Sequence, residues 1–329
     1  MTNIIKRNYT EALATVSACV AGRYKLVATK LDGRTRVIAD WFENLILENG
    51  LHQAAIQASG YLTTCSVGTS SVEPNINQTA LGLRIATITN IFSTVGGAQP
   101  TPPYFGWVRK TFRFATGTAA GTLAEVGVGW SADSMFSRSL IKDSNGNPTT
   151  ITILSDEILD VIYELRLYAP TNDTVGEVTG NGTTYTITAR PYRVNHNLHW
   201  GYDTSSSYVQ HRIGNRIILF ESVYNSSLSV DPRTTLGTVL ETVSATYVNP
   251  SNPANNMTVV NNTYNNDKRV STTYNLSVTA GNESGGIGYI QLITPGTGAY
   301  QFLVSPNIMK TSEHTLSLTF ELQFDRYTP

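Results

Sequence analysis

The sequence is poor in charged residues. Only 14% of its 329 residues are charged, and 23 basic against 24 acidic side chains leave a net charge of −1. Soluble domains usually carry about a quarter of charged residues, and phosphate recognition needs a concentrated basic field. The composition therefore predicts no nucleic-acid partner and argues against a typical cytosolic helical enzyme. A nearly neutral surface instead favours association with other subunits, because strong like-charge repulsion is absent.

Cysteine and long hydrophobic runs are also scarce. The two cysteines, Cys19 and Cys65, lie far apart and form no disulfide framework. We expect buried free thiols, with a disulfide between the two as the alternative. The first 24 residues mix charged and apolar side chains, and no stretch is long enough to cross a membrane. The expectation is a soluble protein made in a cytoplasm, without a membrane span.

The polarity of the sequence comes from Thr, Ser and Asn, which suits β-surfaces and turns. The clearest strand pattern covers residues 107–115 and has two faces. One carries Trp107, Arg109, Thr111 and Arg113, and the other Val108, Lys110, Phe112 and Phe114. The length suits one large domain or two of ordinary size. We predict a mainly β fold of two antiparallel β-sandwich or jelly-roll-like domains, residues 22–170 and 171–329, divided at the Gly/Asn/Thr-rich turn region 171–183.

A short helical insert is predicted at residues 41–58. Asp40 and Glu43 have the spacing of a capping box, which starts a helix at residues 41–49. A second short helix is expected at residues 51–58, where small and apolar residues recur at helical spacing.

Residues 1–21 are predicted to form an N-terminal arm or helix. The helical spacing is carried by Tyr9, Leu13, Val16 and Val20. This segment either packs on its own domain or inserts into a neighbouring subunit. A hairpin follows, in which Asp32-Gly33 is the turn between strands at residues 23–30 and 34–39.

One internal resemblance relates the two halves of the chain. A shift of 157 positions pairs Tyr163-Glu164-Leu165 with Phe320-Glu321-Leu322, inside two long closing strands. A duplicated β-domain explains this pairing, and chance similarity between two amphipathic strands is the alternative.

Motifs for catalysis are missing. The sequence has no G-x-S-x-G elbow, no P-loop and no dinucleotide-binding loop between a strand and a helix, so we expect no enzyme and no cofactor. His196-x-x-His199, with Asp203 and His211 nearby, is the best metal candidate. It lies in a loop-like segment without a cysteine pair or clustered carboxylates, so we expect no metal site.

The same segment is rich in aromatic and imidazole side chains. Such side chains are enriched at contact surfaces because an apolar ring carries a polar tip. The predicted interface or glycan contacts are Tyr192, His196, His199, Trp200, Tyr202 and Tyr208. The alternative is that most of these rings cover the core of their own domain.

Residues 61–89 hold the most informative stretch. A strand at residues 62–67 reaches Gly68, a polar loop with Pro74 follows, and a second strand covers residues 83–89. Ser and Thr hydroxyls are expected to hold the backbone amides of residues 68–71. The run S-V-G-T-S-S…P…Q-T-A-L-G in this stretch resembles a segment common near the N-termini of tailed-bacteriophage virion proteins, such as tail-fibre attachment, collar and other minor structural proteins. The resemblance covers roughly the first third of the chain.

This resemblance implies a structural protein of the virion, made in the host cell cytoplasm and placed in the tail, baseplate or neck–collar. The implied partners are copies of the chain, in a trimer or ring, and other virion proteins. Strand edges, loops and the N-terminal arm would be buried against neighbouring chains. Two alternatives stay open: a tail tip or fibre protein that binds a host surface glycan through the Trp200 region, and a capsid decoration protein.

Overall fold

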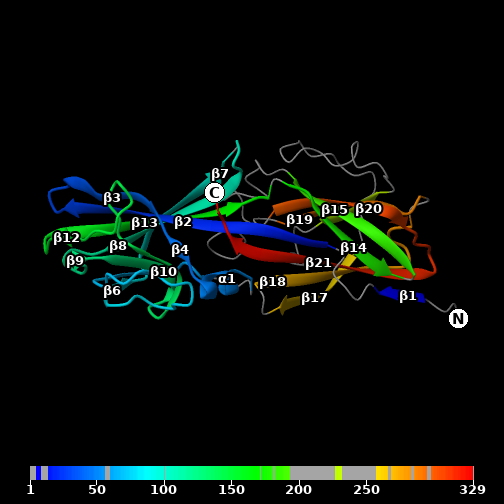
Figure 1. Cartoon of the computed structure of the whole chain (residues 1–329), viewed down its shortest axis with the longest axis horizontal. Helices are drawn as coiled ribbons and strands as arrows, with labels where there is room; N and C mark the ends of the chain where they lie inside the picture. The colour runs from blue at the N-terminus through cyan, green and yellow to red at the C-terminus, as the bar shows by residue number, and fades with distance from the viewer. Residues whose placement is uncertain are drawn as a thin grey trace.

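The fold is mainly β. The computed structural model describes residues 5–8, 14–55, 60–99, 101–170, 172–180, 182–192, 227–231, 257–265, 268–282, 285–294 and 298–328. These residues form several β-sheets and one short helix near the N-terminus, α1 (Glu48–Ala55), so the predicted fold class is confirmed. Figure 1 shows an elongated molecule with the long strands β2 (Ala14–Lys30) and β21 (His314–Arg326) running along its middle.

The largest sheet has nine strands. Its order is β17-β18-β21-β2-β13-β8-β7, with β1 beside β21 and β3 beside β2. The bounds of the other members are β17 (Met257–Asn265), β18 (Arg269–Leu276), β13 (Glu157–Tyr168), β8 (Phe105–Phe114), β7 (Ile91–Ala98), β1 (Ile5–Asn8) and β3 (Thr35–Glu43). Neighbouring strands are antiparallel, except that β21 is parallel to β1 and to β2.

Two five-stranded sheets and one two-stranded sheet complete the described structure. The first has the order β4-β11-β10-β5-β6 and contains β4 (Leu45–Ile46), β11 (Ser134–Leu140), β10 (Glu125–Ser131), β5 (Thr64–Gly68) and β6 (Arg84–Ile88). The second has the order β14-β15-β20-β19-β16 and contains β14 (Thr174–Gly180), β15 (Thr183–Tyr192), β20 (Gly298–Ile308), β19 (Ile287–Thr294) and β16 (Ser227–Asp231). The small sheet pairs β9 (Gly121–Leu123) with β12 (Ile151–Ile153).

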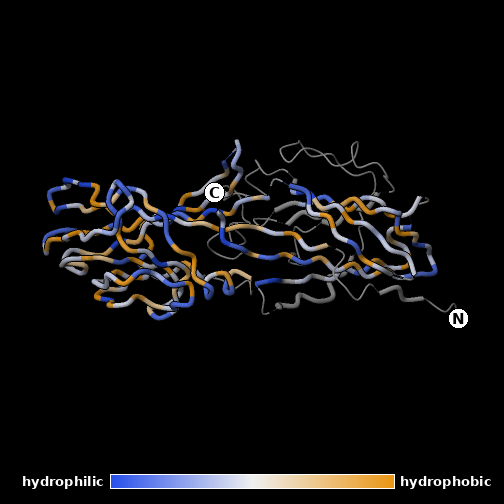
Figure 2. Tube along the Cα trace, in the orientation of Figure 1, coloured by the Kyte–Doolittle hydropathy of each residue, from blue (hydrophilic) through white to orange (hydrophobic). Residues whose placement is uncertain are grey.

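Each five-stranded sheet packs on one part of the nine-stranded sheet, which gives two β-sandwiches. In the first, the hydroxyl of Tyr24 on β2 lies 2.7 Å from the hydroxyl of Ser137 on β11. In the second, the rings of Phe302 on β20 and Phe320 on β21 lie 4.8 Å apart. Figure 2 shows hydrophobic and hydrophilic residues alternating along the strands, as expected when one face of a strand points into a core.

Strand β2 belongs to both sandwiches and extends across residue 22, where the first domain was predicted to begin. It has 17 residues, and a strand of that length spans about 56 Å at 3.3 Å per residue. Its first part pairs with β21, and its residues from Cys19 onward pair with β13. The helix expected within residues 1–21 is therefore wrong for residues 14–20. There, the period-two burial of Val16, Ala18 and Val20 outweighs their helical spacing.

The predicted helical insert at residues 41–58 is shorter than expected. Residues 41–43 continue β3, in which Phe42 pairs with Tyr24 and points into the core. Asp40 does not start a helix, because it lies inside β3. Its carboxylate accepts hydrogen bonds from Lys25 at 2.8 Å and from the amide of Trp41 at 2.9 Å. The part predicted as a second helix overlaps α1, whose described residues end at Ala55.

The two sandwiches repeat one strand order. Seven strands of each half come in the same order along the chain and share the same pairings with one another: β4, β5, β7, β8, β10, β11 and β13 in the first, and β15, β16, β17, β18, β19, β20 and β21 in the second. Among the described residues, β6, β9 and β12 of the first half and β14 of the second have no counterpart in this scheme. The closing strands β13 and β21 occupy equivalent places, and Glu164 and Glu321 lie at equivalent positions on them. This arrangement is what a duplicated domain predicts.

Candidate functional site

The residues predicted to make contacts lie mostly outside the described part of the chain. Tyr192 is the last residue of β15. The other five fall within residues 193–226, which are not among the described residues: His196, His199, Trp200, Tyr202 and Tyr208. Their role in an interface or in glycan binding stays a prediction.

Metal-binding chemistry has no counterpart in the described residues. Among them, no group of three or more His, Cys, Asp or Glu side chains is placed to hold a metal ion. Cys19 and Cys65 are free thiols as predicted, and the predicted burial holds for Cys65, whereas Cys19 is half-buried. Burial raises the pKa of both thiols, and that of Cys65 far more. Neither sulfur is therefore a reactive thiolate near neutral pH.

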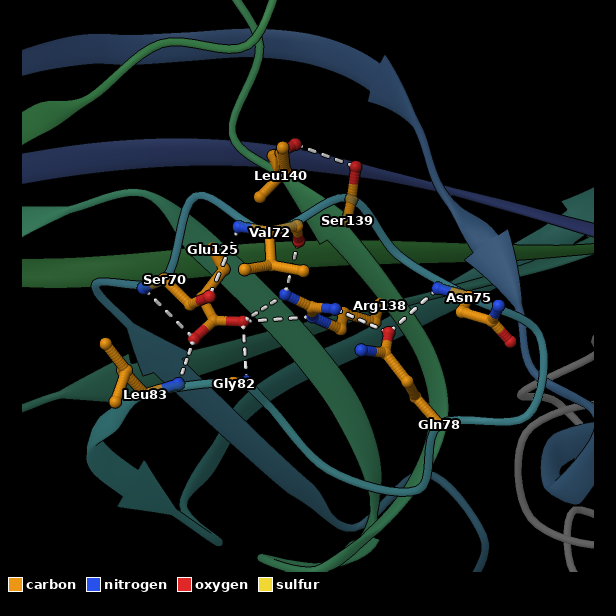
Figure 3. A network of polar contacts seen from close by, with 10 residues as sticks. All are labelled: Ser70, Val72, Asn75, Gln78, Gly82, Leu83, Glu125, Arg138, Ser139 and Leu140. Atoms are coloured by element: carbon orange, nitrogen blue, oxygen red, sulfur yellow. Dashed lines mark hydrogen bonds and ion pairs between the residues drawn. The ribbon is translucent and has the colours of Figure 1, made fainter.

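The best-defined candidate site is built on residues 69–83, which we call the covering loop. This loop joins β5 to β6 within the stretch that carries the phage resemblance. It lies on the outer face of the sheet β4-β11-β10-β5-β6 (Figure 3), and its carbonyl groups accept hydrogen bonds from neighbouring elements. The carbonyl of Thr79 lies 2.7 Å from the amide of Met135, and that of Ile76 lies 2.8 Å from the amide of Glu48.

Glu125 holds both ends of the covering loop. Its side chain is fully buried at the start of β10. Its carboxylate accepts hydrogen bonds from the backbone amides of Ser70 at 3.3 Å, Gly82 at 3.0 Å and Leu83 at 2.8 Å. Hydroxyls were expected to hold the amides of residues 68–71, and this is wrong for Ser70, whose amide binds Glu125, and for Thr69, whose amide binds the carbonyl of Leu83 at 2.9 Å. The Ser70 hydroxyl instead accepts from the amide of Val72, just beyond that range.

Arg138 on β11 is the second anchor and is also fully buried. Its Nε and Nη2 atoms lie 2.9 Å and 2.7 Å from the Oε2 atom of Glu125. The same guanidinium donates to the carbonyl of Val72 at 2.8 Å and to the side-chain carbonyl of Gln78. Figure 3 shows these contacts from β11 into the loop. Because a guanidinium has five donors in a fixed plane, one side chain can hold the sheet and the middle of the loop together.

Glycines allow the covering loop to lie close to the sheet. A Cβ atom at Gly127 of β10 would lie 3.0 Å from the Leu81 side chain, and one at Gly82 would lie 2.5 Å from the Ser70 hydroxyl. Neither approach leaves room for a larger residue. The ion pair is therefore sealed between the sheet and the loop.

The covering loop and β6 present apolar side chains to solvent in a fixed conformation. These side chains are Val72, Ile76, Leu83 and Ile85, and Leu83 is 62% exposed. β6 is the last strand of its sheet, so among the described residues one of its edges has no partner strand. Exposed apolar groups beside an open strand edge are typical of a surface that meets another protein. Glu125 and Arg138 are both engaged in holding the loop, so the exposed groups of this site are the apolar side chains and the open edge of β6.

Sequence reasoning identified this stretch but not its anchors. Glu125 and Arg138 are separated from the loop by more than 40 residues, so no local pattern connects them. The available signal was a single arginine inside the small and apolar strand S-M-F-S-R-S-L, because such a position is seldom charged unless the charge is paired.

Comparisons with known proteins add no relative: no family model, no curated protein and no solved structure matches the chain. In the part of the chain that the structure describes, no helix is both long and apolar enough to cross a membrane.

Proposed function

We propose that the chain is a structural component of a tailed-phage virion, in the tail, baseplate or neck–collar. It would act by assembling with copies of itself and with other virion proteins, and would anchor fibres or connect rings. The resemblance of residues 61–89 to virion proteins supports this role. The observation that carries the proposal is that the same stretch forms the covering loop and β6, which hold four exposed apolar side chains in place.

The energetics of this surface favour assembly. Burying a Val, Leu or Ile side chain contributes about 1.5–3 kcal/mol, and ordering a mobile loop on binding would offset that gain. Here the loop is already fixed by Glu125 and Arg138, so little ordering remains. The open edge of β6 also offers backbone groups that a strand of a neighbouring chain can pair with.

The oligomeric state of the purified protein tests this proposal. We expect a trimer or ring by mass photometry and electron microscopy. The double variant Leu83→Glu/Ile85→Lys should be monomeric with an unchanged far-UV circular dichroism spectrum. Leu31→Lys is the matched control, because Leu31 is 74% exposed at the β2–β3 turn, away from the covering loop.

A native protein that stays monomeric at micromolar concentration would contradict the proposal. So would assemblies that form equally well in the double variant. Copy numbers that match the head lattice of a phage particle would instead favour a capsid decoration protein.

A further inference from the structure

The outer face of the nine-stranded sheet carries a second group of side chains, which we call the arginine–tryptophan patch. It lies in the first sandwich, away from the covering loop on the opposite sheet. Its members come from four neighbouring strands: Arg23 on β2, Trp41 on β3, Trp107 and Arg109 on β8, and Glu164 and Arg166 on β13.

The strand register brings these side chains together. Arg23 and Arg109 both lie directly opposite Glu164, one on each neighbouring strand. Arg166 and Trp107 form the next pair along β13 and β8, on the same face. Residues two apart on a strand share a face, and neighbouring strands lie about 4.8 Å apart. The patch is therefore a compact grid fixed by backbone hydrogen bonds.

Glu164 is surrounded by three guanidinium groups. The Nε atoms of Arg23, Arg109 and Arg166 lie 2.9 Å, 3.1 Å and 2.8 Å from its carboxylate. The side chain of Glu164 is only 3% exposed. Burial alone would raise the pKa of this carboxyl, but the three arginines outweigh burial and lower it. The group is thus a carboxylate at neutral pH, and the cluster contains three positive charges and one negative charge.

Neighbouring charges on the same face do not cancel the excess positive charge of the patch. Lys25 is paired with Asp40 at 2.8 Å, and Arg113 with Asp160 at 2.7 Å, so both pairs are neutral. Glu43 lies opposite Arg23 on β3, and among the described residues no ion pair joins it to the three arginines. Even with Glu43 counted, the patch keeps a net positive charge.

Hydrogen-bond donors are also in surplus. A carboxylate has about four acceptor positions, and Glu164 already accepts four bonds, from Arg23, Arg166 and twice from Arg109. Arg23 uses only its Nε atom, and its two Nη groups make no hydrogen bond to any described side chain or backbone. Arg23 is also a quarter exposed, so these donors are within reach of a ligand in solvent.

The tryptophans lie beside these donors. The guanidinium carbon of Arg23 is 4.3 Å from the centre of the Trp41 ring, and that of Arg109 is 4.9 Å from Trp41 and 5.0 Å from Trp107. Stacking of this kind holds a guanidinium plane in place while its edge stays available. Both rings are half-buried, so part of each ring is accessible.

The second sandwich shows how an equivalent carboxylate is held with a different set of groups. Glu321, at the position of Glu164 under the repeat, accepts hydrogen bonds from Thr15, Ser271 and Arg269 among the described residues. Hydroxyl groups therefore take part in holding a carboxylate at this position of the sheet. The three-arginine arrangement around Glu164 is a feature of the first sandwich rather than of the strand order.

We propose that the arginine–tryptophan patch binds the carboxylate of an acidic sugar residue, such as a uronic acid of a surface polysaccharide. The Nη groups of Arg23 would bind the carboxylate in a bidentate manner, and the exposed part of the tryptophan rings would contact the apolar face of the pyranose. This binding function goes beyond assembly and does not depend on it.

Isothermal titration calorimetry at low salt with a mannuronate oligosaccharide from alginate tests the proposal. A neutral mannose oligosaccharide of the same length and a poly-glutamate peptide are the comparison ligands. We expect binding of the mannuronate alone. Arg23→Gln should weaken it about tenfold, because a charge-assisted hydrogen bond contributes about 1.5 kcal/mol or more and 1.4 kcal/mol is tenfold in affinity.

Matched controls separate the patch from general charge and from assembly. Lys25→Gln/Asp40→Asn, which removes a neutral pair on the same face, and Arg269→Gln beside Glu321 should leave the affinity unchanged. The assembly variant Leu83→Glu/Ile85→Lys should also leave it unchanged. Equal binding of the neutral sugar, binding of poly-glutamate as tight as that of the mannuronate, an unaffected Arg23→Gln variant with an unchanged melting temperature, or no binding at all would each overturn the proposal.

Discussion

Replacing Arg138 by methionine should strongly destabilise the first sandwich. The change keeps most of the side-chain volume but removes both contacts to Glu125 and the donors to Val72 and Gln78. Glu125 then stays buried with a negative charge that only three backbone amides compensate. Breaking a buried ion pair by removing one partner costs about 3–5 kcal/mol. We expect a loss in that range, which is a large part of the 5–15 kcal/mol that usually stabilises a domain.

Urea unfolding followed by circular dichroism measures this loss, and hydrogen exchange locates it. The amides of Ser70, Gly82 and Leu83 should exchange faster in Glu125→Leu/Arg138→Met, because they lose their acceptor. The double variant should nevertheless be more stable than Arg138→Met, since it leaves no unpaired buried charge. A loss below about 1 kcal/mol in Arg138→Met, the value typical of an exposed ion pair, or unchanged exchange of the three amides would refute the reasoning.

Two further predictions concern buried positions in the first sandwich. Burial lowers the pKa of Lys110 from 10.5 to about 8, so the folded chain binds fewer protons than the unfolded chain between these values and its stability rises with pH there. Below pH 8, Lys110→Met should therefore stabilise the protein by about 3 kcal/mol, because each pKa unit corresponds to 1.36 kcal/mol. The loss of the hydrogen bond to the carbonyl of Leu62 reduces this gain. In urea titrations the gain should disappear near pH 10.5. Gly50→Ala should lower the melting temperature although alanine favours helices, because its Cβ would lie 2.3 Å from the carbonyl oxygen of Phe136. Gly176→Ala, with no atom within 4 Å of the new Cβ, is the control and should leave the melting temperature nearly unchanged.

The local structure of β-strands was predictable from alternation and turn chemistry. The pattern of residues 107–115 predicted β8, and the structure buries the face that carries Val108, Lys110, Phe112 and Phe114. Asp32-Gly33 predicted the β2–β3 turn, where Gly33 has a φ of 85°. Both signals depend only on neighbours in sequence, which is why a single sequence contains them.

Pairing across the chain was not predictable in the same way. The parallel pairing of β2 with β21 joins residues about 300 positions apart, so no turn motif or residue spacing predicts it. The capping-box spacing of Asp40 and Glu43 was misleading because Phe42 is buried as a strand residue opposite Tyr24, and tertiary packing overrides a weak helical preference.

The position of the candidate site was predictable from the sequence, but the contacts that hold it together were not. Residues 61–89 were the most informative stretch of the sequence, and the structure places the covering loop and β6 there. The anchoring carboxylate and guanidinium lie on β10 and β11, and their relation to the loop exists only after three strands have paired. Likewise, the role of the face that contains Trp107 and Arg109 could not be predicted from this strand alone, because it depends on Glu164 of the neighbouring strand.

The junction of the two sandwiches bears on the proposed role of joining rings or fibres. Val20 of β2 pairs with β13 on one side and β21 on the other, so the hydrogen-bonded sheet continues through the junction. Tyr168 at the end of β13 stacks on Tyr327 after β21, with 3.6 Å between ring centres. Glu48 of α1 accepts a hydrogen bond from Arg326 at 2.8 Å on the same end of β21. Bending between the sandwiches would break these contacts together. Binding at one end therefore fixes the position of the other, which is the mechanical property that a part joining rings or fibres requires.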